Sequence, residues 1–289
     1  MSSLFRTKGL AEIQATLAES ETAHGLKRTL SAFDLVMLGI GAVIGAGIFS
    51  SIGTAAVGEV AADGTVTRYG AGPALVLSFL LLGAVCALAG LCYAELTALI
   101  PISGSAYTYA YATLGELVAW IIGWDLILEY AVGNIAVAIA WSGYFSSLLR
   151  FFGIEMPFWL CHSYRDVLLS YPEHLGELPA LFGQKLSLNV PGMLIVGIVT
   201  WVLVIGVRES ASLNNAMVIL KLLVLALFVG VGVFYIDPAN WTPFAPNGWR
   251  GIHQGAAIVF FAYIGFDAVS TAAEETKDPQ RDMPRGILI

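Results

Sequence analysis

The stretch that decides the fold is residues 39–49, which read GIGAVIGAGIF. Four glycines fall within nine residues of an otherwise apolar segment. Each glycine weakens a helix interior by about 0.5–1 kcal/mol relative to alanine, so together they favour a break in the helix. Unwound backbone at membrane depth is tolerated only where it is buried in protein or lines a wet cavity. The half-helix that starts after such a break would offer its free amides and positive dipole end to a carboxylate.

Two other interpretations of these glycines are open. Gly41 and Gly45 form a small-xxx-small pair, which is typical of closely packed helices in membranes. Gly39, Gly41 and Gly45 also mimic a dinucleotide-binding fingerprint, and Glu59 follows Gly39 by twenty residues. No strand precedes these glycines and the segment is itself a membrane span, which argues against a nucleotide site.

The surrounding chain has the composition of a membrane protein. Hydrophobic residues make up 57% of the 289 residues, and the mean hydropathy is +0.78. Charged residues make up 12%, against roughly 25% in soluble domains. A spanning helix needs about 20 apolar residues, and six segments qualify, at about 33–57, 74–99, 117–149, 192–207, 216–235 and 252–271. We therefore expect an all-α polytopic membrane domain over residues 31–289.

Charged flanks predict the orientation of these spans. More Lys and Arg lie on the side that holds the N-terminus, so we expect a multi-pass protein of the cell membrane with a cytoplasmic N-terminus. Residues 1–30 carry scattered charges without an apolar core, which predicts a cytoplasmic tail rather than a cleavable signal peptide. The loop over residues 153–187 is the largest external segment and is expected to form a structured cap. The chain stops at the expected start of a seventh span, near residues 284–287, so we expect it to be a fragment of a longer product.

The sixth span repeats the theme of the first. Residues 260–267 read FFAYIGFD, so Tyr263, Gly265 and Asp267 interrupt an apolar run, and a small, polar segment follows. Two broken helices in one membrane protein are the best sequence indication of a substrate site near the bilayer midplane. Carbonyl groups freed at such a break would face an ammonium group. The alternative is an ordinary glycine kink.

Lys221 lies about five residues inside the fifth span, and an ionisable residue at such a position is a functional hypothesis by default. Its ammonium group must reach the interface, find a partner or lose its proton. A lysine that loses its proton inside a transporter is a candidate for proton coupling. At roughly 8 Å of depth the side chain could instead reach the cytoplasmic face, and the sequence leaves both possibilities open.

Asp125 and Glu129 are four residues apart on the third span and therefore share one helix face. Carboxylates inside a span are expected to face the protein interior, where either could relay protons or hold a cation. A purely structural, hydrogen-bonded role is the alternative for both residues. The sequence shows no Ser/His/Asp set, no metal-ligand cluster and no phosphate-binding loop, so we expect neither an enzyme nor a cofactor nor a metal. No basic stripe suggests nucleic acid as a partner.

Four segments together resemble the amino acid–polyamine–organocation superfamily. Residues 39–49 look like its glycine-rich first helix, and residues 103–107 (SGSAY) and 123–130 (GWDLILEY) resemble its second-to-third helix signature. Phe266 and Asp267, with residues 274–287 (EETKDPQRDMPRGI), resemble its cationic amino acid transporter branch. The resemblance extends from about Gly25 to the end of the chain.

The resemblance implies a leucine-transporter-like fold of two inverted five-helix repeats, with helices one and six broken at the substrate site. This chain would hold the first repeat and the sixth helix, and it departs from the family in lacking the second repeat. Eighth-helix contacts and later gating elements are absent from it.

The same resemblance implies roles for individual residues. In the first helix, the substrate carboxylate would be held by Ile44, Gly45, Ala46 and Gly47. In the sixth helix, the carbonyl groups that would accept from the substrate amino group belong to Phe261, Ala262 and Ile264. Phe261 would also suit an aromatic gate. Lys221 matches the fifth-helix lysine that, in proton-coupled members, occupies the place of a sodium ion.

The predicted function is transport of an amino acid across the lipid bilayer by alternating access, as proton-coupled symport of an L-amino acid. Amino acid and proton are thus the expected partners, while an exchanger would look the same in sequence. The alternative hypothesis is a non-transporting membrane sensor, or an assembly module that needs a partner chain.

Overall fold

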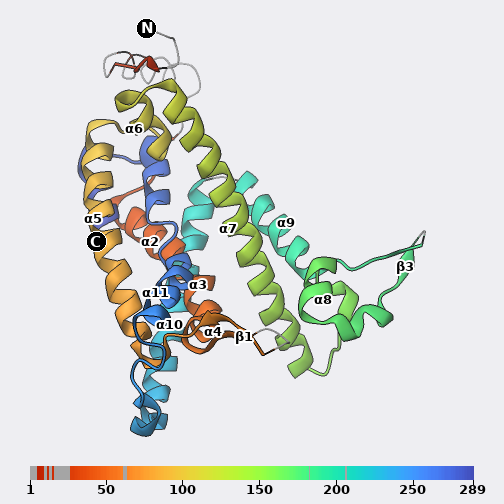
Figure 1. Ribbon diagram of the computed structural model, residues 1–289. Helices are drawn as coiled ribbons and strands as arrows, with labels where there is room; N and C mark the ends of the chain where they lie inside the picture. The colour runs from red at the N-terminus through yellow and green to blue at the C-terminus, as the bar shows by residue number, and fades with distance from the viewer. Residues whose placement is uncertain are drawn as a thin grey trace. The chain divides into compact units, whose positions relative to one another are not determined.

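The computed structural model describes residues 5–9, 12, 15, 27–60, 64–181, 183–205 and 207–289, most of them helical (Figure 1). The chain divides into two compact units, one formed by Met1–Ile127 with Arg208–Ile289 and the other by Leu128–Val207. Most of the tail predicted for residues 1–30 lies outside the described residues.

Five helical segments of the described chain are long and apolar enough to cross a membrane: Ala32–Phe49, Gly72–Leu99, Glu116–Phe151, Ala211–Tyr235 and Gly248–Glu275. Each overlaps one of the predicted spans. The predicted fourth span falls on α9 (Val190–Ile205), which has 16 residues. At 1.5 Å per residue this helix is about 24 Å long, shorter than the hydrocarbon layer of about 30 Å. In contrast, α7 (Glu116–Phe151) has 36 residues and is about 54 Å long, so it must tilt or project from a bilayer.

Over its described residues, the first unit is mostly helical and contains an antiparallel hairpin. In chain order, its elements are α2 (Ala32–Val43), α3 (Ala46–Phe49), α4 (Ser51–Val57), β1 (Gly58–Val60), β2 (Val66–Tyr69), η2 (Gly72–Ala74), α5 (Leu75–Leu99), α6 (Ser105–Thr113), the start of α7, α10 (Val207–Gly232), η5 (Val233–Tyr235), η6 (Pro238–Trp241), α11 (Gly248–Val259), η7 (Phe260–Ala262), η8 (Asp267–Glu275) and α12 (Pro279–Leu288).

The start of α2 is fixed by a capping box. The Ser31 side chain accepts from the Asp34 backbone amide, while the Asp34 carboxylate accepts from the Ser31 backbone amide at 2.9 Å. Two amides of the first turn, which have no partner within a helix, are thereby satisfied. The chain therefore enters its first membrane helix at a defined residue.

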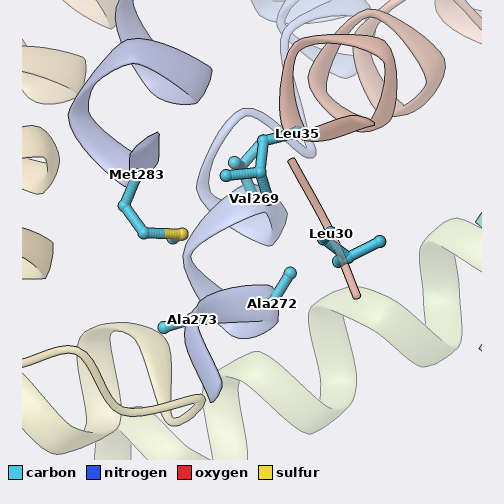
Figure 2. Close-up of a cluster of buried hydrophobic side chains, with 6 residues drawn as sticks. All are labelled: Leu30, Leu35, Val269, Ala272, Ala273 and Met283. Carbon is cyan, nitrogen blue, oxygen red and sulfur yellow. The ribbon is translucent and has the colours of Figure 1, made fainter. Parts of the chain in front are cut away.

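One group of elements packs around α2. Helix α2 contacts η8 and α12, and α12 also lies along α5. The six buried residues at the centre of this group are drawn in Figure 2: Leu30, Leu35, Val269, Ala272, Ala273 and Met283. Backbone hydrogen bonds add to this packing, because the Leu30 amide donates to the Glu275 carbonyl at 3.0 Å and the Lys277 amide donates to the Leu30 carbonyl at 3.0 Å. The segment that leads into α2 is thus fastened to the end of η8.

A second group of elements packs around α11. Helices α3 and α4 contact α11, and α3 also contacts η7. The β1–β2 hairpin belongs to this group, since the Tyr69 amide donates to Gln254 Oε1 at 2.5 Å and Asn247 Nδ2 donates to the Gly70 carbonyl at 2.8 Å. The Arg250 guanidinium lies 4.5 Å from the centre of the Tyr69 ring. The two halves of the first span therefore belong to different packed groups.

The segment where a seventh span was expected to start forms α12, with Met283 and Gly286 buried. Its ten residues cover about 15 Å, and the expectation of a seventh span stays a prediction. Leu35 Cβ would lie 2.5 Å from a Cβ added at Gly286, so this glycine lets α12 approach α2 closely.

The second unit holds the remainder of α7, then η3 (Phe158–Leu160), α8 (Tyr164–Ser170), η4 (Pro172–Glu177), β3 (Ala180–Leu181), β4 (Gln184–Lys185) and α9. Aromatic contacts organise the loop between α7 and α9. The Phe158 ring stacks on His162 and on His174, with centroid distances of 4.2 and 4.3 Å. The part of the chain predicted to form a cap is thus folded into short elements within this unit.

Truncation of Met283 tests the packing around α2. Met283 is fully buried, so we expect Met283→Ala to destabilise the protein by about 2 kcal/mol or more, because it leaves a cavity between α12, η8 and α2. The measurement is thermal unfolding of the purified protein in detergent. Leu80→Ala on α5 is the control, because Leu80 is 67% exposed. Equal melting temperatures for the two variants would contradict the packing described.

Candidate functional site

The first span is interrupted inside the glycine-rich stretch. Helix α2 ends at Val43, the chain bends at Ile44 and Gly45, and α3 begins at Ala46 (Figure 1). Carbonyl groups of the last turn of α2 and amides of the first turn of α3 have no partner within their own helices. The break predicted from the glycines therefore places both kinds of backbone group at one position in the span.

Lys221 on α10 satisfies the carbonyl side of this break. Its Nζ donates to the Gly41 carbonyl at 2.8 Å and to the Ile44 carbonyl at 2.7 Å. An ammonium group is favoured at this place because the C-terminal end of a helix carries a partial negative charge. Hydrogen bonds from a charged donor are also roughly twice as strong as neutral ones. The structure thus gives the Lys221 ammonium group an internal partner, whereas its role in proton coupling stays a prediction.

Two asparagines extend the contact between α10 and α2. Asn214 Nδ2 donates to the Met37 carbonyl at 3.3 Å, and Asn215 Nδ2 donates to Asp34 Oδ1 at 2.8 Å. Asn214 and Lys221 are seven residues apart and lie on one face of α10. Together they fasten three turns of α2 to this helix.

Gly41 leaves room for α10 to pack against α2. A Cβ at Gly41 would lie 2.7 Å from Asn214 Oδ1 and 3.3 Å from Val218 Cγ2. Val218 is buried, with 1% of its surface exposed. Gly41 thus serves close packing, in line with the packing interpretation for this one glycine.

The sixth span is interrupted opposite the first. Helix α11 ends at Val259, η7 follows over Phe260–Ala262, and a turn leads to η8. Gly265 in this turn has a φ of +109°, a region that glycine enters readily and other residues do not. The observed conformation therefore accounts for the glycine in this span.

The two interruptions pack against each other. A Cβ added at Gly47 would overlap the backbone of Ala262, and a Cβ added at Gly265 would lie 2.8 Å from Ala42 Cβ. Gly47 and Ala262 are both buried. The glycine-rich stretch thus brings the backbone of α3 directly against that of η7.

Most of the predicted substrate-site residues are brought together by this packing. Those on α3 and its approach, Ile44, Gly45, Ala46 and Gly47, lie where α3 contacts η7. Those of the sixth span, Phe261, Ala262 and Ile264, lie in η7 and the turn that follows it. The direct contact between these two sets joins Gly47 and Ala262, and the role of all seven residues in substrate binding stays a prediction.

The two carboxylates of α7 are placed differently. Asp125 is exposed on the part of α7 in the first unit, and Glu129 is half-buried on the part in the second unit. The expectation that both face the protein interior stays a prediction, with Glu129 the more buried of the two. Because the helix turns by about 100° per residue, a spacing of four leaves the two side chains offset by about 40°, enough to separate a half-buried position from an exposed one.

Sequence reasoning missed Asn214, Asn215 and Asp34. The predicted fifth span began at about residue 216, so the asparagines counted as its polar flank, whereas α10 continues through them. The signal that could have found them is the spacing of Asn214, Val218 and Lys221, at helix positions i, i+4 and i+7. Polar side chains in register with an intramembrane lysine indicate a helix contact.

The structure has apolar helices long enough to span a bilayer, and the first and sixth spans are interrupted and pack against each other at their breaks. These features are typical of a multi-pass membrane protein of the permease type. The model of the amino acid permease family matches residues 30–289. The chain belongs to this family, which confirms the resemblance to the amino acid–polyamine–organocation superfamily.

Curated relatives agree with this assignment. The chain is 48% identical over 288 residues to the methylthioribose transporter of Bacillus subtilis (strain 168), covering 100% of this chain and 56% of that protein. It is 48% identical over 286 residues to the branched-chain amino acid permease BcaP of the same organism, covering 99% and 55%. Identity to the chloroplastic cationic amino acid transporter 9 of Arabidopsis thaliana is 39% over 291 residues, covering 99% and 46%. The chain thus spans about half the length of these relatives.

Gly47→Ala tests the contact between the two interruptions. Because the new Cβ would overlap the Ala262 backbone, we expect this single methyl group to push α3 away from η7 and to abolish amino acid binding. Equilibrium binding to the purified protein in lipid is the measurement. Gly53→Ala in α4 is the matched control, since a Cβ at Gly53 meets nothing within 4 Å. Unchanged affinity in the Gly47 variant would show that this contact does not form part of the site.

Proposed function

We propose that this protein carries an L-amino acid across the membrane together with a proton, by alternating access. The observation that carries the proposal is the break between α2 and α3, whose carbonyl groups are held by Lys221 and whose far side packs against the interruption of the sixth span. Family membership supports the general activity. The proposal further includes the leucine-transporter-like fold of inverted five-helix repeats, and a cell-membrane location with the N-terminus in the cytoplasm.

The substrate backbone would bind at the two interruptions. The amides around Gly45, Ala46 and Gly47 suit a carboxylate, because first-turn amides lack intrahelical partners and carry the positive end of the helix dipole. Carbonyl groups of η7 and the following turn suit an α-amino group, because their 3₁₀ and turn geometry leaves lone pairs free to accept. An amino acid presents these two charges on one carbon atom, which matches two backbone sites in contact.

Side-chain preference is a separate question from recognition of the amino acid backbone. The relatives have names that refer to branched-chain amino acids, cationic amino acids and methylthioribose. Because BcaP and the methylthioribose transporter are each 48% identical to this chain, identity does not favour either substrate. The half-buried Phe261 is the side chain that we propose as an aromatic gate over the substrate.

Proton coupling would operate through Lys221. When protonated, its ammonium group holds the Gly41 and Ile44 carbonyls and fixes the end of α2 on α10. Loss of the proton would replace charge-assisted hydrogen bonds by weaker neutral ones. The end of α2 would then be released more easily, which links protonation to opening and closing of the break.

Replacement of Lys221 tests this coupling. We expect Lys221→Ala to fold and to lose acid-stimulated amino acid uptake in proteoliposomes, because no group then titrates at the break. Lys185→Ala is the control, because Lys185 lies in the exposed β4 strand and donates to the Leu175 carbonyl. Lys221→Arg adds a variant that keeps the charge at every working pH, and its uptake should also be independent of pH. Normal acid stimulation in either Lys221 variant would refute the coupling.

Glu129 and Asp125 are proposed as further groups on the proton route. The half-buried Glu129 is the stronger candidate, since a carboxylate shielded from solvent is the kind of residue that relays protons in membrane proteins. We expect Glu129→Gln to reduce proton-driven uptake at least tenfold, and Asp125→Asn to reduce it by a smaller factor, because Asp125 is exposed and Glu129 is half-buried. Equal effects of the two substitutions on pH-dependent uptake would contradict this assignment.

The whole proposal is tested by binding of labelled alanine and arginine to the purified protein in lipid at acidic and neutral pH. Saturable, competable and pH-dependent binding is expected, and the better ligand identifies the substrate class. A folded protein that binds neither amino acid at either pH would contradict amino acid transport.

A further inference from the structure

Tyr263 ties the interruption of the sixth span to α5. Its hydroxyl donates to the backbone carbonyl of Phe79 at 3.0 Å. The rings of Phe79 and Tyr263 also lie near each other, with centroids 6.2 Å apart and planes inclined by 49°. This contact joins residues 184 positions apart in sequence, at a turn that has lost the regular hydrogen bonds of an α-helix.

The carbonyl that receives this bond lies inside a continuous helix. Within α5 the Phe79 carbonyl accepts from the amide four residues later, at Gly83, and its second lone pair is available to the tyrosine. A Cβ added at Gly83 would lie 3.2 Å from the Tyr263 hydroxyl oxygen and 3.9 Å from Cζ. Glycine in a helix interior costs about 1 kcal/mol relative to alanine, and at this position it leaves room for the hydroxyl.

The hydrogen bond from Tyr263 to the Phe79 carbonyl holds the interrupted part of the sixth span, because Tyr263 lies within it. It lies between Ala262, which packs against Gly47, and Gly265, which packs against Ala42. Its own amide donates to the Phe260 carbonyl at 2.9 Å. The tyrosine therefore anchors the one stretch of the sixth span whose carbonyl groups would receive the substrate amino group.

We propose that Tyr263 is a positioning residue that fixes this stretch through the Phe79 carbonyl, with Gly83 as the space that the bond requires. The inference rests on the proposed function, because it assigns Tyr263 to the amino-group side of that site. Tyr263 does not need to touch the substrate. It limits the rotation of the turn between η7 and η8, so that the carbonyl groups keep one orientation toward an ammonium group.

A double-mutant cycle tests the proposal in the protein reconstituted in lipid. The variants are Tyr263→Phe, Gly83→Ala and the two combined, and the probe is the amino acid that the wild type binds better, alanine or arginine. One hydrogen bond contributes about 0.5–1.5 kcal/mol, so we expect each single variant to weaken binding by about three- to tenfold. The double variant should be no weaker than Tyr263→Phe alone, because the added methyl group no longer meets a hydroxyl.

A ligand comparison separates positioning from general damage to the fold. The matching carboxylic acid without an α-amino group serves as the competitor. We expect Tyr263→Phe to leave the affinity for this acid unchanged while it weakens the amino acid. Equal losses for both ligands would overturn the assignment to the amino-group side.

Two substitutions serve as matched controls. Tyr235→Phe removes a hydroxyl from an exposed tyrosine, and Gly230→Ala adds a methyl group that meets nothing within 4 Å. Both should bind like the wild type. Additive losses in the Tyr263 and Gly83 cycle, or no loss in either single variant, would overturn the proposed pairing.

The stability of the same variants distinguishes a failure of this inference from a failure of the proposed function. If the wild type binds neither amino acid, the proposed function fails. Tyr263 then has no amino-group site to position. Non-additive changes in melting temperature among Tyr263→Phe, Gly83→Ala and the double variant would then identify a purely structural bond. If the wild type binds and the variants bind equally well, only the inference about Tyr263 fails.

Discussion

The arrangement of the first unit depends on the ammonium group of Lys221 meeting the end of α2. A helix that stops inside a membrane leaves carbonyl groups without partners, and each unsatisfied group costs several kcal/mol where water is absent. Lys221 supplies donors to two of them, at Gly41 and Ile44. A lysine is itself costly at membrane depth unless its ammonium group is paired. The broken helix supplies carbonyl acceptors for the ammonium group, and the ammonium group supplies donors for the carbonyls.

Glycine has three different uses in the same region. Gly265 permits a backbone conformation with positive φ, Gly47 permits backbone contact with Ala262, and Gly41 permits contact with Asn214. By contrast, a Cβ at Gly45, the residue at the break itself, would meet only the Ala42 carbonyl, at 3.9 Å. The glycine-rich stretch therefore contains both a helix break, at Gly45, and close packing contacts, at Gly41 and Gly47. The break interpretation and the packing interpretation apply to different glycines.

The sequence predicted the apolar spans and the break of the first one, because apolar length and glycine content are visible in a list of residues. It also singled out Lys221 as an intramembrane charge, whose role in coupling stays a prediction. It could not identify the partners of Lys221, since backbone carbonyl groups have no side-chain signature. Asn214 and Asn215 were missed because a hydropathy pattern ends at polar residues although the helix continues. The α12 segment was expected to begin a span, which stays a prediction; its contacts with α2 and α5, with Met283 and Gly286 buried, could not be predicted because they depend on the tertiary arrangement.

The packing of the two interrupted spans also determines which parts can move together. Helix α2 packs on η8, whereas α3 and α4 pack on α11 and η7, so each half of the first span is paired with one half of the sixth. Further contacts strengthen each pairing, through Leu30 and Glu275 in one group and through Tyr69 and Gln254 in the other. Helix α5 contacts both groups, through α12 and η8 in one and through α11 in the other. A bound molecule that bridges α3 and η7 would contact the second group alone, whereas Lys221 holds the end of the first group and the Ile44 carbonyl at the joint. Under the proposed function, the substrate and the proton would therefore act on opposite sides of one helix break, which would let each influence the other without direct contact.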